Sequence, residues 1–153
     1  MKSAVFDYIF VFKKSRMETI INDNVRNMRK QDVVNSFFES LKEVRKTRPF
    51  ATQDDVIRHA AGSKAPRFYV TFENARRFVS LMARKKRLPL INPNKLAMYK
   101  EIYRRYKKRV KGCGECCRYI ILDEIIREPA PSFYLDIETF RGIVYKTLAH
   151  SRN

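Results

Sequence analysis

The sequence predicts a mostly α-helical protein made of two related helix-turn-helix-like units in tandem. Only four of its 153 residues are glycine and six are proline, so few residues interrupt long helices. Hydrophobic residues make up 44%, including 11 Phe and 8 Tyr, which is enough to bury a core. We expect an N-terminal arm over residues 1–31, a first unit over 32–94 and a second over 95–153.

The N-terminal arm begins with a short apolar run that Asp7 interrupts and the basic pair Lys13-Lys14 follows. The run is too short to span a bilayer and has no small-residue cleavage site. We expect an edge strand or a packing arm here. An alternative is that Met17 is the true start of the protein.

The first helix of the first unit is predicted from Asp32 to about Pro49, which ends it or follows its end. Apolar residues recur there at one-, three- and four-residue steps, as on the buried side of a packed helix. They are Val33, Val34, Phe37, Phe38, Leu41 and Val44.

A second, short helix is predicted to begin at the acidic pair Asp54-Asp55 and to run to about Ala61, where Gly62 is suited to a C-cap. A third helix is predicted from Pro66 to Lys85, because proline fits a first helical turn. A loop with two prolines separates it from a fourth helix over 95–110, whose inner side carries Leu96, Tyr99, Ile102, Tyr103 and Tyr106.

The second half of the chain repeats part of the first. Residues 65–70 (APRFYV) recur as residues 130–135 (APSFYL), and Glu73, Arg76 and Val79 match Glu138, Arg141 and Val144 at the same offset of 65. This pattern indicates an internal duplication. The alternative is chance similarity between two amphipathic helices that begin with Ala-Pro.

The formal net charge of +17 is larger than folding needs, and a polyanionic partner is the usual reason for such an excess. Nucleic acid is the first candidate, an anionic membrane the second and an acidic protein the third. The surplus is concentrated in residues 84–111, which carry a net +11, whereas residues 112–153 carry −1. We therefore expect the polyanion to bind near the fourth helix.

The segment 33–78 resembles the helix-turn-helix DNA-binding domain of the TetR family of repressors. The resemblance rests on Ala51-Thr52, Ile57, Ala61-Gly62, Phe68-Tyr69 and Phe72, which follow in the family's order. It implies a unit centred on residues 61–78 whose last helix presents its N-terminal residues to the major groove. The residues expected there are Lys64, Arg67, Tyr69 and Thr71. In the alternative interpretation Lys64 and Arg67 are solvated and Tyr69 belongs to the core.

A stripe of basic residues is expected to bind phosphates. Its members are Arg84, Lys85, Lys86, Arg87, Lys100, Arg104, Lys107, Lys108 and Lys111, and the last five share one face of the fourth helix. The alternative is a solvated face without a partner.

No catalytic motif is recognisable, so no enzyme activity, cofactor or metal is expected. The cysteines Cys113, Cys116 and Cys117 supply fewer ligands than a structural zinc site needs, although His59 or His150 would complete a set of four. Three clustered cysteines do not form a secreted disulfide framework, which favours a reducing, cytoplasmic location.

Together these features predict a small DNA-binding protein, such as a transcriptional regulator or a mobile-element accessory factor, with duplex DNA favoured over RNA. The alternative is an RNA-binding or protein-interaction module. Residues 112–153 are the expected site of a homodimer or protein contact. No membrane partner is expected, and a membrane-surface role for residues 1–14 is the third hypothesis.

Overall fold

The computed structural model describes the backbone of residues 2–152 and the side chains of residues 20–152. Six helices follow one another along this part of the chain, and an isolated β-bridge is its only extended pairing. The helices are α1 (Lys2–Thr47), α2 (Gln53–Ala61), α3 (Phe72–Ala83), α4 (Pro93–Arg109), α5 (Glu115–Arg127) and α6 (Ile137–His150). The mostly α-helical fold is confirmed.

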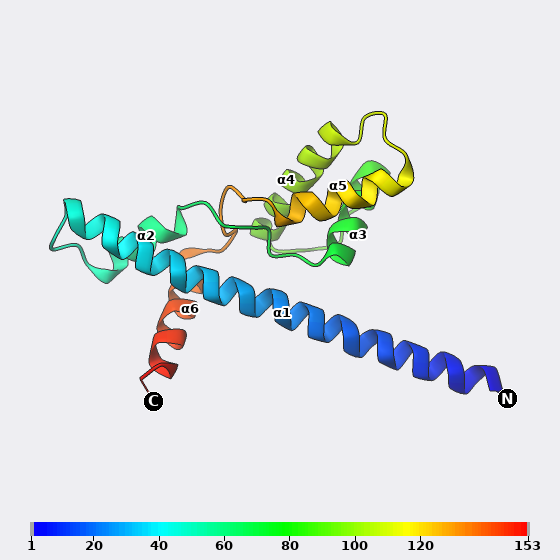
Figure 1. Ribbon diagram of the computed structural model, residues 1–153, viewed down its shortest axis with the longest axis horizontal. Coiled ribbons are helices and arrows are strands. Elements are labelled where there is room, and N and C mark those ends of the chain that lie inside the picture. Colours follow the sequence, from blue (N-terminus) through cyan, green and yellow to red (C-terminus); the bar gives the residue numbers. More distant parts are fainter. Residues whose placement is uncertain (1, 153) are drawn as a thin grey trace.

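Of the two alternatives for the N-terminal run, the edge strand is wrong, because α1 is one continuous helix. Its N-terminal end projects beyond the other helices (Figure 1). The helix predicted from Asp32 thus begins at Lys2. No glycine or proline occurs before Pro49, so nothing in the backbone stops the helix from extending toward the N-terminus. The apolar side chains proposed for a membrane surface, in residues 1–14, lie outside the described side chains.

The helices pack in two groups of three, and one of these groups brings together the two ends of the chain. The C-terminal part of α1 packs with α2 and α6, while α3 packs with α4 and α5. Phe37, Ile57 and Phe140 are buried in the first group, and Phe78 and Ile102 in the second. Thus α3, the last helix of the expected first unit, packs on helices of the second, and α6, the last helix of the second, packs on helices of the first. The division into tandem related units remains a prediction, and these contacts cross its boundary.

The two groups are joined where residues 62–71 and 128–136 cross. Ala65 N donates to Ala130 O at 3.0 Å and Ala130 N donates to Ala65 O at 2.9 Å. Beside this bridge Phe68 stacks on Tyr134 and Tyr69 stacks on Phe133, with ring centroids 6.2 and 6.0 Å apart. Ala65 and Ala130 are matched positions of the internal similarity, whereas each stacked pair joins a Phe of one segment to a Tyr of the other.

The crossing also explains why α3 begins later than predicted. The sequence prediction placed Pro66 in the first turn, but Ala65 and Ala130 each precede a proline, which biases a residue toward the extended conformation. Extended alanines form the bridge, and α3 starts only after Thr71, whose side chain accepts from Asn74 N. The fourth helix, predicted over 95–110, is confirmed as α4.

Among the described residues, none of the helices combines the length and the apolar composition needed to cross a membrane.

Candidate nucleic-acid interface

Basic side chains cover one side of α4, and we call Lys100, Arg104, Arg105, Lys107, Lys108, Arg109 and Lys111 the α4 surface. Four of them, Arg104, Arg105, Lys108 and Arg109, line a hollow of about 360 Å³ that has no other lining residue. They lie on successive turns because positions three, four and five apart share one side of a helix. A hollow with only cationic walls favours an anion.

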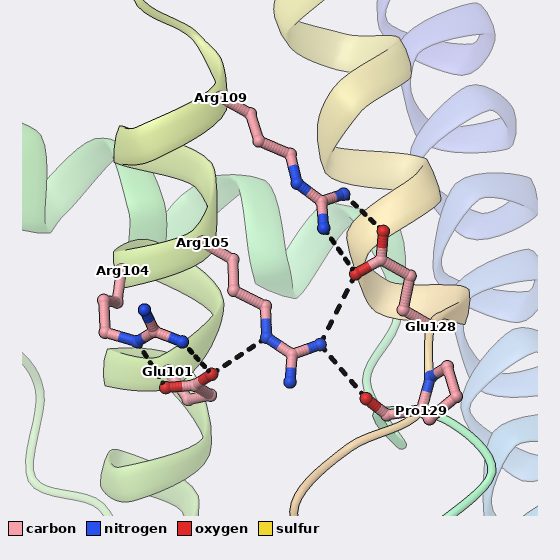
Figure 2. A network of polar contacts seen from close by, with 6 residues as sticks. All are labelled: Glu101, Arg104, Arg105, Arg109, Glu128 and Pro129. Carbon is pink, nitrogen blue, oxygen red and sulfur yellow. Dashed lines mark hydrogen bonds and ion pairs between the residues drawn. The ribbon is translucent and has the colours of Figure 1, made fainter.

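The arginines of this surface are held by two carboxylates (Figure 2). Glu101 accepts from Arg104 Nε and from Arg105 Nε, both at 2.8 Å. Glu128, at the end of α5, accepts two hydrogen bonds from Arg109, one of them at 2.9 Å. The guanidinium groups are therefore fixed before any ligand arrives.

Arg105 is the centre of this network. Its Nη1 donates to Pro129 O at 3.1 Å and to Glu128 Oε2 at 3.4 Å, and its guanidinium lies 5.0 Å from the centroid of the Phe68 ring. Its side chain is only 20% exposed. Arg105 thus ties α4 to both crossing segments, and its main role is structural.

These contacts also keep the carboxylates ionised. The hydrogen bonds from Arg104 and Arg105 outweigh partial burial and lower the pKa of Glu101 to about 2. The hydrogen bonds from Arg109 likewise lower the pKa of Glu128. Three of the four cations that line the hollow are therefore partly neutralised at neutral pH by carboxylates beside it.

The lysines differ from the arginines in having no carboxylate partner. Lys100, Lys107, Lys108 and Lys111 are exposed, and no ion pair joins them to another described residue. Basic residues in the last turn of α4 also interact favourably with the helix dipole, and this stabilises the helix without any ligand. That benefit does not extend to Lys100 in the middle of the helix. The unpaired charge of the α4 surface thus belongs mainly to its lysines.

Of the four residues expected to read bases, only Thr71 lies at the start of a helix. Lys64, Arg67 and Tyr69 belong to the extended segment before α3, and Thr71 caps that helix. Arg67 lies against α1, with Nη1 3.8 Å from Met28 Sδ. Tyr69 is half-buried and donates to Asp32 Oδ2 at 2.6 Å, and burial and this hydrogen bond raise its pKa. The contacts of Arg67 and Tyr69 are those of residues that fasten the crossing to α1.

In a helix-turn-helix, two helices pack on each other across a short turn. Here residues 62–71 separate α2 from α3, and no contact joins these two helices in the part of the chain that the structure describes. The helix that packs against both α1 and α2 is α6 instead. The TetR resemblance stays a prediction, and α3 is not the helix that completes its three-helix packing.

The basic residues after α3 lie close to the turn that ends that helix. Arg84, Lys85, Lys86 and Arg87 are all exposed. Lys85 N donates to Met82 O and Lys86 N to Leu81 O, a Schellman end in which Lys85 takes a φ of 53°. This left-handed conformation favours glycine, and the chain has a lysine there.

The sequence prediction missed Arg105 and Arg109 and the two carboxylates that bind them. The Glu101 contacts were readable, because Arg104 and Arg105 follow Glu101 by three and four residues on one helix. The Glu128 contacts were not, because they join α4 to a residue far along the chain.

The acidic pairs and the cysteines form no second centre. Asp55 completes a capping box with Thr52, and Asp54 pairs with Arg58 and with Arg141 of α6. Cys113, Cys116 and Cys117 are free thiols. The described residues contain no group of His, Cys, Asp and Glu side chains placed to hold a metal ion.

Comparison with protein families, with curated proteins and with solved structures finds no match to this chain. Its function is therefore inferred from its own residues.

Proposed function

We propose that the chain is a small nucleic-acid-binding protein that contacts the phosphate backbone of duplex DNA through the α4 surface. The observation that carries this proposal is the group of exposed, unpaired lysines beside a hollow lined only by cationic side chains. Exposed lysines that form no internal ion pair repel one another. A polyanion removes that repulsion.

The spacing of the lysines suits a duplex. Lys100 and Lys108 are separated by about 12 Å along the helix axis, and the major groove of B-DNA is about 12 Å wide. A helix lying across the groove would therefore bring the two ends of the stripe toward phosphates on opposite sides. The basic residues 84–87 supply further contacts.

Contacts of this kind position a protein on DNA without reading its sequence. Arg67 and Tyr69, the residues expected to reach base edges, are engaged with α1. The proposed role is thus closer to that of an accessory or architectural DNA-binding factor than to that of a sequence-specific repressor.

Fluorescence anisotropy tests the proposal with a labelled duplex, a duplex of unrelated sequence and a single-stranded RNA, each over a salt series. We expect both duplexes to bind alike at low salt and to be released steeply as salt rises. Arg67→Ala is expected to change duplex affinity less than twofold. Failure of either duplex to bind at low salt contradicts the proposal, and tighter binding of RNA favours an RNA-binding module instead.

We also propose residues 112–153 as a protein-contact region. Tyr119, Ile120 and Tyr145 are large apolar side chains in that region that are exposed to solvent. Sedimentation velocity over a concentration series tests for a homodimer. A monomer at all concentrations contradicts self-association.

A further inference from the structure

A second cationic site lies in a cleft of about 540 Å³ that the crossing segments help to line. Residues from the middle of α1 and from the first turns of α3, α4 and α6 line it. The cations among them are Arg26, Arg29 and Lys95. We call this cavity the anion cleft.

Arg29 is in an unusual environment for an arginine. Its Nε is buried and has no hydrogen-bond partner, and no ion pair joins Arg29 to another described residue. An unsatisfied buried donor costs free energy and is rare in folded proteins. Burial, and after it the nearby charge of Arg26, lowers the pKa of Arg29. A bound anion beside the guanidinium would favour its charged form and offset both effects on the pKa.

The other cations of the cleft are also available. Lys95 lies in the first turn of α4 and forms no ion pair with a described residue. Arg26 has only a distant contact of 4.0 Å with Asp23, in which both side chains are largely exposed. Asp136, which accepts from Thr139 N at 2.6 Å, is the only carboxylate among the described residues that line the cleft. The lining therefore has a net positive charge.

Two capped helix ends add neutral donors to this charge. Asn92 caps α4 by accepting from Asn94 N at 2.8 Å, and Thr71 caps α3. Asn92, Asn94 and Asn74 all line the cleft. The caps already satisfy the N–H groups of Asn94 and Asn74, so the neutral donors beside the three cations are the amide groups of the asparagine side chains.

The rest of the wall is aromatic. Tyr69, Tyr99, Phe133 and Tyr134 line the cleft, and Tyr69 is stacked on Phe133 at an interplanar angle of 6°. Flat rings of this kind accept a flat ring of a ligand. A cavity of this size holds a small molecule.

We propose that the anion cleft binds a nucleotide, with its phosphate at Arg29, Arg26 and Lys95 and its base against the aromatic wall. This site is separate from the α4 surface and does not depend on that surface binding DNA. The phosphate comes either from a free mononucleotide or from the 5′ end of a nucleic-acid strand.

Isothermal titration calorimetry of the full chain tests the proposal with adenosine 5′-monophosphate and with adenosine. We expect the monophosphate to bind at least tenfold more tightly than adenosine. Arg29→Gln is expected to weaken monophosphate binding at least tenfold, whereas Lys30→Gln, which removes an exposed charge one residue further along α1, changes it less than twofold. Equal binding of the two probes, or binding of neither, overturns the proposal.

A gain-of-binding variant guards against loss through misfolding. Asp136→Asn removes the one carboxylate of the cleft and keeps a residue that caps helices well. We expect it to tighten monophosphate binding severalfold. Unchanged or weaker binding contradicts the proposed place of the phosphate.

The two sources of the phosphate are separated with a pair of DNA oligonucleotides that differ only in a 5′-phosphate. A preference for the phosphorylated strand that disappears in Arg29→Gln assigns the cleft to strand ends. Equal binding of the two strands, together with monophosphate binding, assigns it to a free nucleotide. Failure of duplex binding by the α4 surface leaves these outcomes unaffected.

Discussion

Arg105 of the α4 surface and Arg29 of the anion cleft occupy opposite environments. Arg105 binds two carboxylates, a backbone carbonyl and an aromatic ring, and three chain segments meet at its guanidinium. The Nε of Arg29 is a buried donor that has no hydrogen-bond acceptor. The difference shows that a count of basic residues does not locate a binding site. Arginines whose donors are bound by other protein groups stabilise the fold, whereas cations without such partners remain available to a ligand.

The largest expected effect is the difference in protein stability between the variants of these two arginines. Arg105→Gln leaves Glu101 and Glu128 with fewer donors and should lower the free energy of unfolding by about 2–3 kcal/mol. Arg29→Gln removes an unsatisfied buried donor and should leave the free energy of unfolding unchanged or raise it by up to about 1 kcal/mol. Urea denaturation followed by circular dichroism measures both. Equal destabilisation by the two variants would contradict the distinction.

A smaller effect is expected at Glu101, the carboxylate that binds Arg104 and Arg105. Glu101→Gln should lower the free energy of unfolding at pH 7 by about 1 kcal/mol, because the pair is partly exposed. The same variant frees two arginines and should tighten duplex binding.

The pH dependence gives Glu101 an independent test. Its pKa is about 2 in the folded protein against an ordinary value of 4.5, so its ionised form stabilises the fold above pH 4.5. That contribution is lost as the pH falls from 4.5 through 2. Thermal unfolding over this range should therefore show a flatter pH dependence for Glu101→Gln than for the unaltered chain. Parallel curves would exclude this role.

The smallest effect concerns Lys85, whose φ of 53° favours glycine. Lys85→Gly should raise the free energy of unfolding by about 1 kcal/mol. Lys86→Gly removes the same charge one residue later and serves as the matched control, with no gain in stability expected. If Lys85 also contacts phosphate, its replacement weakens duplex binding while the fold becomes more stable, which would explain a lysine at this position.

Local features of the sequence predicted the helices but not their partners. Gly62, Asp54-Asp55 and the stripe of α4 are local signals, and they located α2 and α4 closely. The exchange of α3 and α6 between the two groups depends on where residues 62–71 and 128–136 cross, which no local pattern specifies. Ala65-Pro66 carried two signals, a helix start and an extended alanine, and the second proved correct in the folded chain.

The same limit applies to the sites. The basic stripe was visible as a run of charge, but the pairing of Arg105 and Arg109 with Glu128 required the fold. The anion cleft had no signal in the sequence, because its residues come from four helices and the crossing segments. Arg29 in particular stands in a stretch of α1 that carries no motif.

The central claim is that the unpaired lysines of the α4 surface bind the DNA backbone, and the salt dependence of duplex affinity tests it most directly. Replacing Lys100, Lys107 and Lys108 together with glutamine should reduce the slope of log affinity against log salt by about three. The control replaces Lys30, Lys42 and Lys46 of α1, which are also exposed, and changes the net charge by the same amount. We predict an almost unchanged slope for the control. An equal loss of slope in both triple variants would show that only net charge matters and would contradict the account.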